Sequence, residues 1–165
     1  MNFAATYTPE NTHFSGLSTR LVAAGMLTHD QSNDAERHVR STNRSLIRHL
    51  IDTVNIDSKA LAEMASAEYG IPVFDVSAMN RDLLPDHQIS NDMMVQHHAV
   101  PLFRRGNRLF VAVSDPMNLA ALNEFKFAAD MNTDAVLADD AALNQLIRDI
   151  AEGSNGLDRD MAALS

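Results

Sequence analysis

Residues 16–39 and 45–68 are two copies of one sequence unit, offset by 29 positions. The apolar positions agree between the copies: Leu17 with Leu46, Leu21-Val22 with Leu50-Ile51, Leu27 with Ile56, and Ala35 with Met64. A unit of this length leaves an apolar face uncovered unless a neighbouring unit packs on it, as stacked helical hairpins do. The repeat therefore predicts a bundle of about four short helices, arranged as two repeated hairpins, over residues 15–70.

Local signals predict where these helices begin and end. Gly25 accepts the left-handed conformation at little cost and is expected to end the first helix. Thr28 is expected to cap a second helix over about 29–41. Asp57 is the matching cap in the second copy, whose last helix is expected to end near Gly70.

The second helix of the first copy has few apolar residues. Ser32 and Glu36 stand where the second copy has Leu61 and Ala65. A helix without an apolar stripe has little to bury, so we expect this one to be more exposed, or bound to a molecule outside this chain.

After Gly70 the pattern changes from helical spacing to short apolar runs. A three-stranded sheet is predicted from residues 99–104, 108–113 and 133–137, with a tight turn at Gly106-Asn107 between the first two. Residues 73–76 are predicted to form a further short strand. Residues 77–90 are predicted to be a loop, in which Pro85 allows one turn of helix.

Two or three helices are predicted to accompany this sheet. One spans about 92–98, one begins at Asp115-Pro116, and one is capped by Asp139 or Asp140. The middle helix is expected to turn Leu119, Leu122 and Phe125 inward.

The chain as a whole is therefore predicted to have an α+β fold. A flexible N-terminus (1–14) precedes the repeated hairpins (15–70) and a small α/β subdomain (71–152). Residues 153–165, rich in Gly, Ser, Asn and Asp, are predicted to be a linker.

Composition excludes several classes of protein. The net charge of −9 argues against nucleic-acid binding. No apolar run approaches the roughly 20 residues of a membrane helix, and residues 1–14 do not resemble a secretory signal. The absence of cysteine excludes disulfides and thiolate metal sites and agrees with a cytoplasmic location.

No catalytic or metal-binding motif is present. A phosphate loop requires two glycines five positions apart followed by Lys and Ser or Thr. No two of the six glycines have this spacing, which also excludes ATP hydrolysis by a phosphate loop in this chain. The histidines lack the spacing of a metal site, so no catalytic residue, metal or cofactor is assigned to the chain.

Three segments resemble the N-terminal domain of type IV pilus assembly and type II secretion ATPases. They are Tyr69 to Val76, Val100 to Pro116, and Leu122 to Phe127, and the second is most similar to pilus extension motors of the PilB type. The resemblance implies a hexameric parent motor whose ATP and Mg²⁺ bind in a domain beyond Ser165. It implies partners from the pilus machinery, and a place in the cytoplasm next to the inner membrane.

The repeat itself resembles the paired motifs of the cyclic-di-GMP-binding domain in this superfamily. Ligand-binding members begin each motif with Arg-Leu-Gly and end it with Gln. The arginine positions here are Gly16 and Ser45, the glycine positions are Ser18 and Ile47, and the glutamine positions are Val39 and Glu68. The mid-motif glycine remains as Gly25 but becomes Val54 in the second copy.

These replacements argue against cyclic-di-GMP, because its phosphates need cationic or backbone N–H donors. We therefore expect a regulatory or docking domain rather than a nucleotide sensor. The alternative is a sensor in which nearby side chains replace the lost donors, with Arg20, Gly25, Arg44 and Arg48 as the candidate ligand-binding residues.

Three surfaces are candidates for docking a PilZ-type adaptor, the inner-membrane platform or the motor's own ATPase domain. They contain Arg37 and Arg40, then Met93 and Met94, then Arg104, Arg105 and Arg108. The alternatives are a solvated helix face for the first, core filling for the methionines and a solvated turn for the last.

Overall fold

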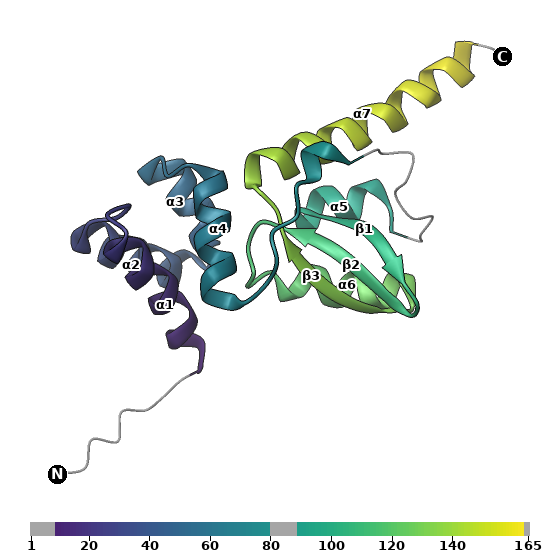
Figure 1. The fold of residues 1–165 in the computed structure, drawn as a ribbon. Coiled ribbons are helices and arrows are strands. Elements are labelled where there is room, and N and C mark those ends of the chain that lie inside the picture. Colours follow the sequence, from purple (N-terminus) through teal and green to yellow (C-terminus); the bar gives the residue numbers. More distant parts are fainter. Residues whose placement is uncertain (1–8, 80–88, 164–165) are drawn as a thin grey trace. The chain divides into compact units, whose positions relative to one another are not determined.

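The computed structural model describes residues 9–79 and 89–163, with side chains for 16–79 and 89–153 (Figure 1). Within these residues the chain forms seven α-helices, one 3-10 helix and a three-stranded sheet. The predicted α+β fold class is confirmed. The chain divides into two compact units, residues 1–70 and 71–165.

The first unit is all helical and consists of α1 (Pro9–Ala23), α2 (His29–Thr42), α3 (Leu46–Val54) and α4 (Ser58–Tyr69). α1 packs against α4 and α2, and α2 packs against α3. Two of these three contacts join one repeat copy to the other, so the copies interleave. Their shared core contains Leu17, Leu21, Leu27, Ala35, Val39, Leu46, Ile47, Leu50, Ile56, Leu61, Ala62 and Ala65.

The predicted caps are present. The Thr28 hydroxyl accepts a hydrogen bond from the Gln31 N–H, and the Gln31 side chain accepts one from the Thr28 N–H, which completes a capping box. Asp57 accepts a hydrogen bond from the Ala60 N–H at 3.0 Å. Gly70, at φ 68°, ends α4 in the left-handed conformation.

The repeat is present in the backbone as well as in the sequence. The Leu27 N–H donates to the Leu21 carbonyl at 3.3 Å, and the Ile56 N–H donates to the Leu50 carbonyl at 3.3 Å. The four residues are related by the same offset of 29. The turn that follows the first helix of each copy is therefore built in the same way.

The second unit contains one mixed sheet. Its elements are η1 (Val76–Ala78), α5 (Asn91–His97), β1 (Ala99–Arg105), β2 (Arg108–Val113), α6 (Leu119–Ala129), β3 (Asn132–Leu137) and α7 (Asp140–Ala163). β1 and β2 are antiparallel, and β2 and β3 are parallel because α6 carries the chain back between them. α6 packs against β3 and lies behind the sheet in Figure 1, while α7 packs against η1, α5 and β1.

Two helices extend into segments for which the sequence predicts none. α1 begins at Pro9, inside the expected flexible N-terminus, of which residues 1–8 lie outside the described residues. Proline suits a first helical turn because its missing N–H would have no partner there. α7 continues past Gly153 to Ala163, where a linker is predicted. A helical glycine costs only about 1 kcal/mol, and no proline interrupts the segment.

The prediction of a strand at residues 73–76 is wrong. Val73 forms a single bridge with Leu137, and Val76 begins the 3-10 helix η1. Asp75 accounts for the change, because its carboxylate accepts a hydrogen bond from the Ser77 N–H and bends the backbone. The helical turn predicted at Pro85 lies outside the described residues.

The helix predicted to begin at Asp115-Pro116 begins instead at Leu119, with Asn118 as its cap. The Asp115 carboxylate accepts a hydrogen bond from the Met117 N–H at 2.9 Å, which holds a turn rather than a helix start. Phe125 is buried as predicted, but Leu119 is 57% exposed. Leu119 precedes the buried Ala121 by two residues and therefore lies about 200° away around the helix.

Replacing the Thr28 cap should destabilise the first unit. The Thr28→Ala variant loses the capping box, and we expect a loss of about 1 kcal/mol in the free energy of unfolding. Urea denaturation followed by circular dichroism measures it. The control is Thr53→Ala, an exposed threonine inside α3 with no capping role. Equal losses in both variants would contradict the capping assignment.

Candidate functional site

The beginning of the first repeat copy and the end of the second lie together. Arg20 on α1 donates from Nε to Glu68 Oε2 on α4 at 2.9 Å. A methyl group added at Gly16 would collide with Glu68 Oε1, so the carboxylate fills the space beside this glycine. An arginine at position 16, as in the motif that the repeat resembles, would displace the carboxylate from its ion pair.

The two motif positions expected to be glycine are filled by buried side chains. Ser18 is 1% exposed and Ile47 is 4% exposed. The Ser18 hydroxyl has no hydrogen-bond partner among the described residues. A ligand that needs close backbone approach at these positions would have to displace core side chains.

The four candidate ligand-binding residues lie on different elements. Gly25 lies in the turn after α1, at φ 74°. Arg20 pairs with Glu68. Arg44 lies exposed between α2 and α3, and Arg48 lies 3.8 Å from Asp52 on α3. Arg20 and Arg48 are therefore paired with different carboxylates.

Two histidines that the sequence analysis left unassigned meet between α2 and α3. The rings of His38 and His49 stack with their centroids 4.4 Å apart and their planes at 26°. Burial lowers the pKa of His49 below its ordinary value, His38 and Arg44 lower it further, and Asp52 opposes them. His49 thus lies close to Arg44 at the α2–α3 connection.

The exposed face of α2 has a shallow hollow of about 530 Å³, lined by Asn33, Glu36, Arg37, Arg40 and Ser41. Arg37 lies 3.4 Å from Asp34, and Arg40 lies 3.9 Å from Glu36. Exposed pairs of this kind contribute little to stability, so both guanidinium groups are able to exchange partners. This hollow presents the two candidate docking arginines of the first unit side by side.

The other docking candidates lie in the second unit. Met94 is only 3% exposed, so its assignment to a docking surface is wrong and the core-filling alternative holds. Met93 is half-buried. The predicted hairpin turn is present, and Arg104 donates to the Gly106 carbonyl at 3.0 Å.

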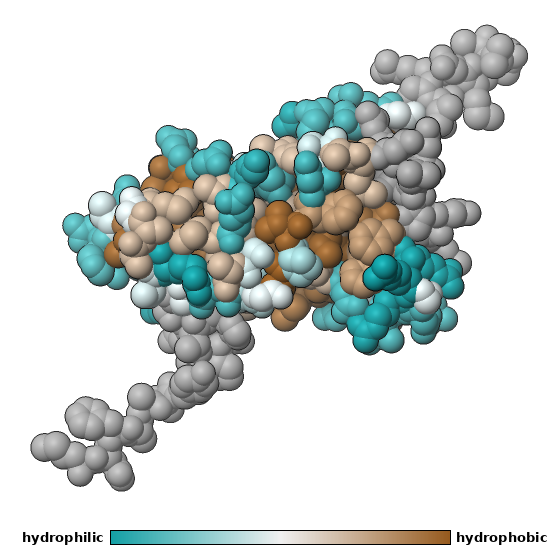
Figure 2. Space-filling model, in the orientation of Figure 1, coloured by the Kyte–Doolittle hydropathy of each residue, from teal (hydrophilic) through white to brown (hydrophobic). Residues whose placement is uncertain are grey.

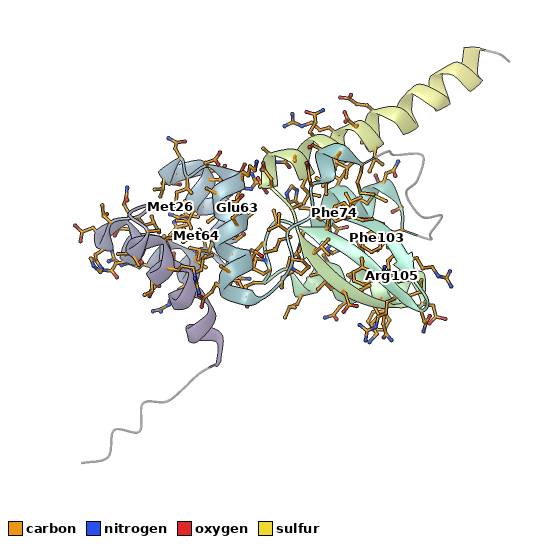
Figure 3. The ribbon with its side chains drawn as sticks, in the orientation of Figure 1. Met26, Glu63, Met64, Phe74, Phe103 and Arg105 are labelled. Atoms are coloured by element: carbon orange, nitrogen blue, oxygen red, sulfur yellow. The ribbon has the colours of Figure 1, made fainter. Side chains whose placement is uncertain are left out.

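The hairpin end is a cationic surface. Arg108 pairs with Asp134 on β3, and Figure 3 shows Arg105 at the end of the hairpin, near Phe103. Figure 2 shows hydrophilic side chains gathered over this end of the sheet, beside apolar ones. Phe103 stacks on Phe110 with ring centroids 4.8 Å apart.

A buried polar cluster was not predicted. Ser114 donates to Asp140 Oδ1 at 2.7 Å, and His98 Nε2 lies 2.9 Å from the same oxygen. Asn144 donates to Asp140 Oδ2 at 3.3 Å. Serine and histidine both contact the carboxylate rather than each other, so the arrangement does not activate a nucleophile and instead fixes the start of α7. No sequence motif marks these contacts between distant residues.

The described side chains contain no group of three or more metal-ligating residues. Among the described helices, none combines the length and the hydropathy needed to cross a membrane.

Residues 69–156 match the MshEN domain family, which covers more than half of the chain. The chain belongs to the MshEN domain family. The resemblance predicted from the sequence is thereby confirmed. The matched residues begin at the end of α4 and run through the sheet of the second unit into α7.

Curated relatives of this MshEN chain are pilus motors. It is 33% identical over 153 residues to the type IV pilus assembly ATPase PilB of Pseudomonas aeruginosa, covering 90% of this chain and 27% of that protein. It is 26% identical over 134 residues to PilB of Acinetobacter baylyi, covering 81% and 23%. The chain thus spans about a quarter of the length of these relatives.

Solved structures show the same fold. The N-terminal domain of XpsE matches with a TM-score of 0.66 at 18% identity, covering 82% of this chain and 94% of that one. A structure of MshE with cdg matches with a TM-score of 0.61 at 24% identity, covering 80% and 96%.

The lowered pKa of His49 should make stability depend on pH. Because the pKa of His49 is lowered on folding, protonation favours the unfolded chain. Its contribution to stability is complete above the ordinary value of 6.5 and is lost as the pH falls through the lowered pKa. We expect the melting temperature of the His49→Asn variant to fall less than that of the wild type when the pH is lowered from about 8 to about 5. Thermal denaturation measures this, with the exposed His29→Asn as control. An unchanged pH dependence in His49→Asn would refute the expectation.

Proposed function

We propose that this chain is the non-catalytic N-terminal docking and regulatory domain of a type IV pilus extension motor. The family and the PilB relatives support this proposal, as does the lack of a phosphate loop in the sequence. ATP and Mg²⁺ would bind in the remaining three quarters of such a motor, which would be hexameric. The domain would act in the cytoplasm next to the inner membrane, through protein partners.

The contact of Glu68 with Gly16 and Arg20 is the observation that favours docking over nucleotide sensing. A phosphate placed at this junction would meet the Glu68 carboxylate. Arg20, which could otherwise bind the phosphate, is already paired with Glu68. The negative charges of the phosphate and the carboxylate would repel each other, and a guanidinium group in an ion pair has fewer N–H donors left for a ligand. The junction is therefore poorly suited to a dinucleotide with two phosphates.

The α2 hollow is the docking surface that we propose for a pilus partner, such as a PilZ-type adaptor or the inner-membrane platform. Its helix has only three buried residues, so most of its surface is open to a partner. Arg37 and Arg40 suit acidic side chains, because guanidinium groups bind carboxylates in a bidentate manner. The motor's own ATPase domain is the third possible occupant.

Sensing of cyclic-di-GMP is the second candidate function. The likeness to MshE solved with cdg favours it, since the same fold holds that ligand there. In this chain the donors would be Arg20, Arg44 and Arg48, of which Arg20 would have to leave Glu68 and Arg48 would have to leave Asp52.

Titration calorimetry with cyclic-di-GMP separates the two functions. We expect no binding by this chain, and none by Glu68→Gln, which restores the neutral amide but not the motif arginines. The N-terminal region of MshE is the positive control. A dissociation constant below about 10 μM, or roughly 7 kcal/mol, in the wild type would overturn the docking proposal in favour of sensing.

Charge reversal on α2 tests the docking surface. We expect the Arg37→Glu, Arg40→Glu double variant to weaken binding of a PilZ-type adaptor at least about tenfold, because rim and contact charges would then repel acidic partners. Surface plasmon resonance with the purified adaptor measures the change. Lys59→Glu, an exposed reversal on α4, is the matched control. If the double variant binds the adaptor as tightly as the wild type does, α2 is not the docking surface.

A further inference from the structure

The two stacked histidines lie at the end of the α2 hollow. His38 and His49, which we call the histidine pair, stack with ring centroids 4.4 Å apart where α2 packs against α3. His38 directly follows Arg37, and it lies three positions before Ser41, so His38 and Ser41 are neighbours on the helix surface. Arg37 and Ser41 both line the hollow, and the Ser41 hydroxyl donates to the His38 carbonyl at 3.0 Å. A charge on the histidine pair is therefore placed beside the docking surface.

The histidine pair takes up its first proton more readily than its second. Both residues are half-buried rather than fully buried, so water reaches the rings. Two positive charges on rings this close repel each other strongly. Ionisable groups that interact in this way titrate in two steps, which belong to the pair and not to either residue. The first step adds one positive charge at the contact between α2 and α3.

The other charges around the histidine pair nearly balance. Residues 33–54, from the start of the α2 hollow to the end of α3, contain four arginines and three carboxylates, a net charge of +1. Three of the arginines are paired with a carboxylate: Arg37 with Asp34, Arg40 with Glu36, and Arg48 with Asp52. Burial is the largest cause that lowers the pKa of His49, followed by His38 and Arg44, whereas Asp52 raises it. α1 also packs against α2, and the one charged residue among its described side chains, Arg20, is paired with Glu68.

We propose that the histidine pair makes docking at the α2 hollow depend on pH, with acidic partners bound more tightly when the pair is protonated. This inference rests on the proposed docking function. The first proton raises the net charge of residues 33–54 from +1 to +2, and complementary charge favours carboxylates on the partner. By linkage, a partner that prefers the protonated chain raises the proton affinity of the pair by the same factor.

Surface plasmon resonance at two pH values tests this inference. The probe is the purified PilZ-type adaptor, bound to the whole chain at about pH 7.5 and at about pH 5.5, on either side of the ordinary histidine pKa of 6.5. We expect the dissociation constant of the wild type to be about two to three times lower at the lower pH, a difference of roughly 0.5 kcal/mol. The effect is small because a single charge near an exposed surface is well solvated.

Variants connect the pH dependence to the histidine pair. The His38→Asn, His49→Asn double variant has no titrating ring at this place, so its pH dependence should be smaller than that of the wild type. His29→Asn, an exposed change at the first residue of α2, is the matched control and should behave as the wild type does. Histidines of the adaptor itself contribute equally to all three measurements. Circular dichroism at both pH values checks that each variant is folded.

A second measurement needs no variant. The imidazole protons of the pair, followed by NMR in the wild type, report the pH at which the first proton is bound. Adding the adaptor should raise this midpoint, since binding and protonation favour each other to the same extent.

The outcomes that contradict this inference differ from those that contradict docking. Equal pH dependence in the wild type and the double variant, or a midpoint that the adaptor leaves unchanged or lowers, would overturn the inference and leave docking at α2 intact. An adaptor that binds the wild type at neither pH would overturn the docking proposal, and the inference with it.

Discussion

The first unit depends on the interleaving of its two repeat copies. Leu21 and Leu50 occupy equivalent positions, both are fully buried, and the helices that carry them pack against the second helix of the other copy. Each copy thus covers the apolar face that the other leaves open, as expected for repeats that are too small to form a core alone. The same arrangement places Gly16, at the start of the first copy, beside Glu68, at the end of the second.

This arrangement explains how the repeat can have its apolar pattern without the residues of a nucleotide site. The apolar positions close the core, so replacing them would destabilise the whole unit. Of the motif positions, Gly16 and Glu68 lie at the junction of the copies, whereas Ser18, Val39 and Ile47 are buried in the core. Glu68 paired with Arg20 is compatible with the fold, although a carboxylate there is unfavourable for a phosphate. The core positions thus fix the fold, and the junction of Gly16 with Glu68 decides how a phosphate would be received there.

Local interactions explain which features the sequence predicts. The caps at Thr28 and Asp57 were predicted because a cap depends on residues within three positions. Asp75 and Asp115 led to wrong predictions because an aspartate begins a turn as readily as it begins a helix or follows a strand. The cluster around Asp140 was not predictable, since the parallel pairing of β2 with β3 brings it to Ser114. Phe127 on α6 is 81% exposed while Phe125 is fully buried, which likewise depends on which face of the helix meets the sheet.

The excess negative charge of the chain limits how the proposed α2 surface works. With a net charge of −9, the protein as a whole repels acidic partners at long range. At about 0.1 M salt this repulsion fades beyond roughly 10 Å, and contacts at the surface then decide the outcome. A few arginines gain little free energy from exposed ion pairs alone. Stable docking at α2 must therefore depend on contacts within the hollow beside Arg37 and Arg40 as well as on their charges.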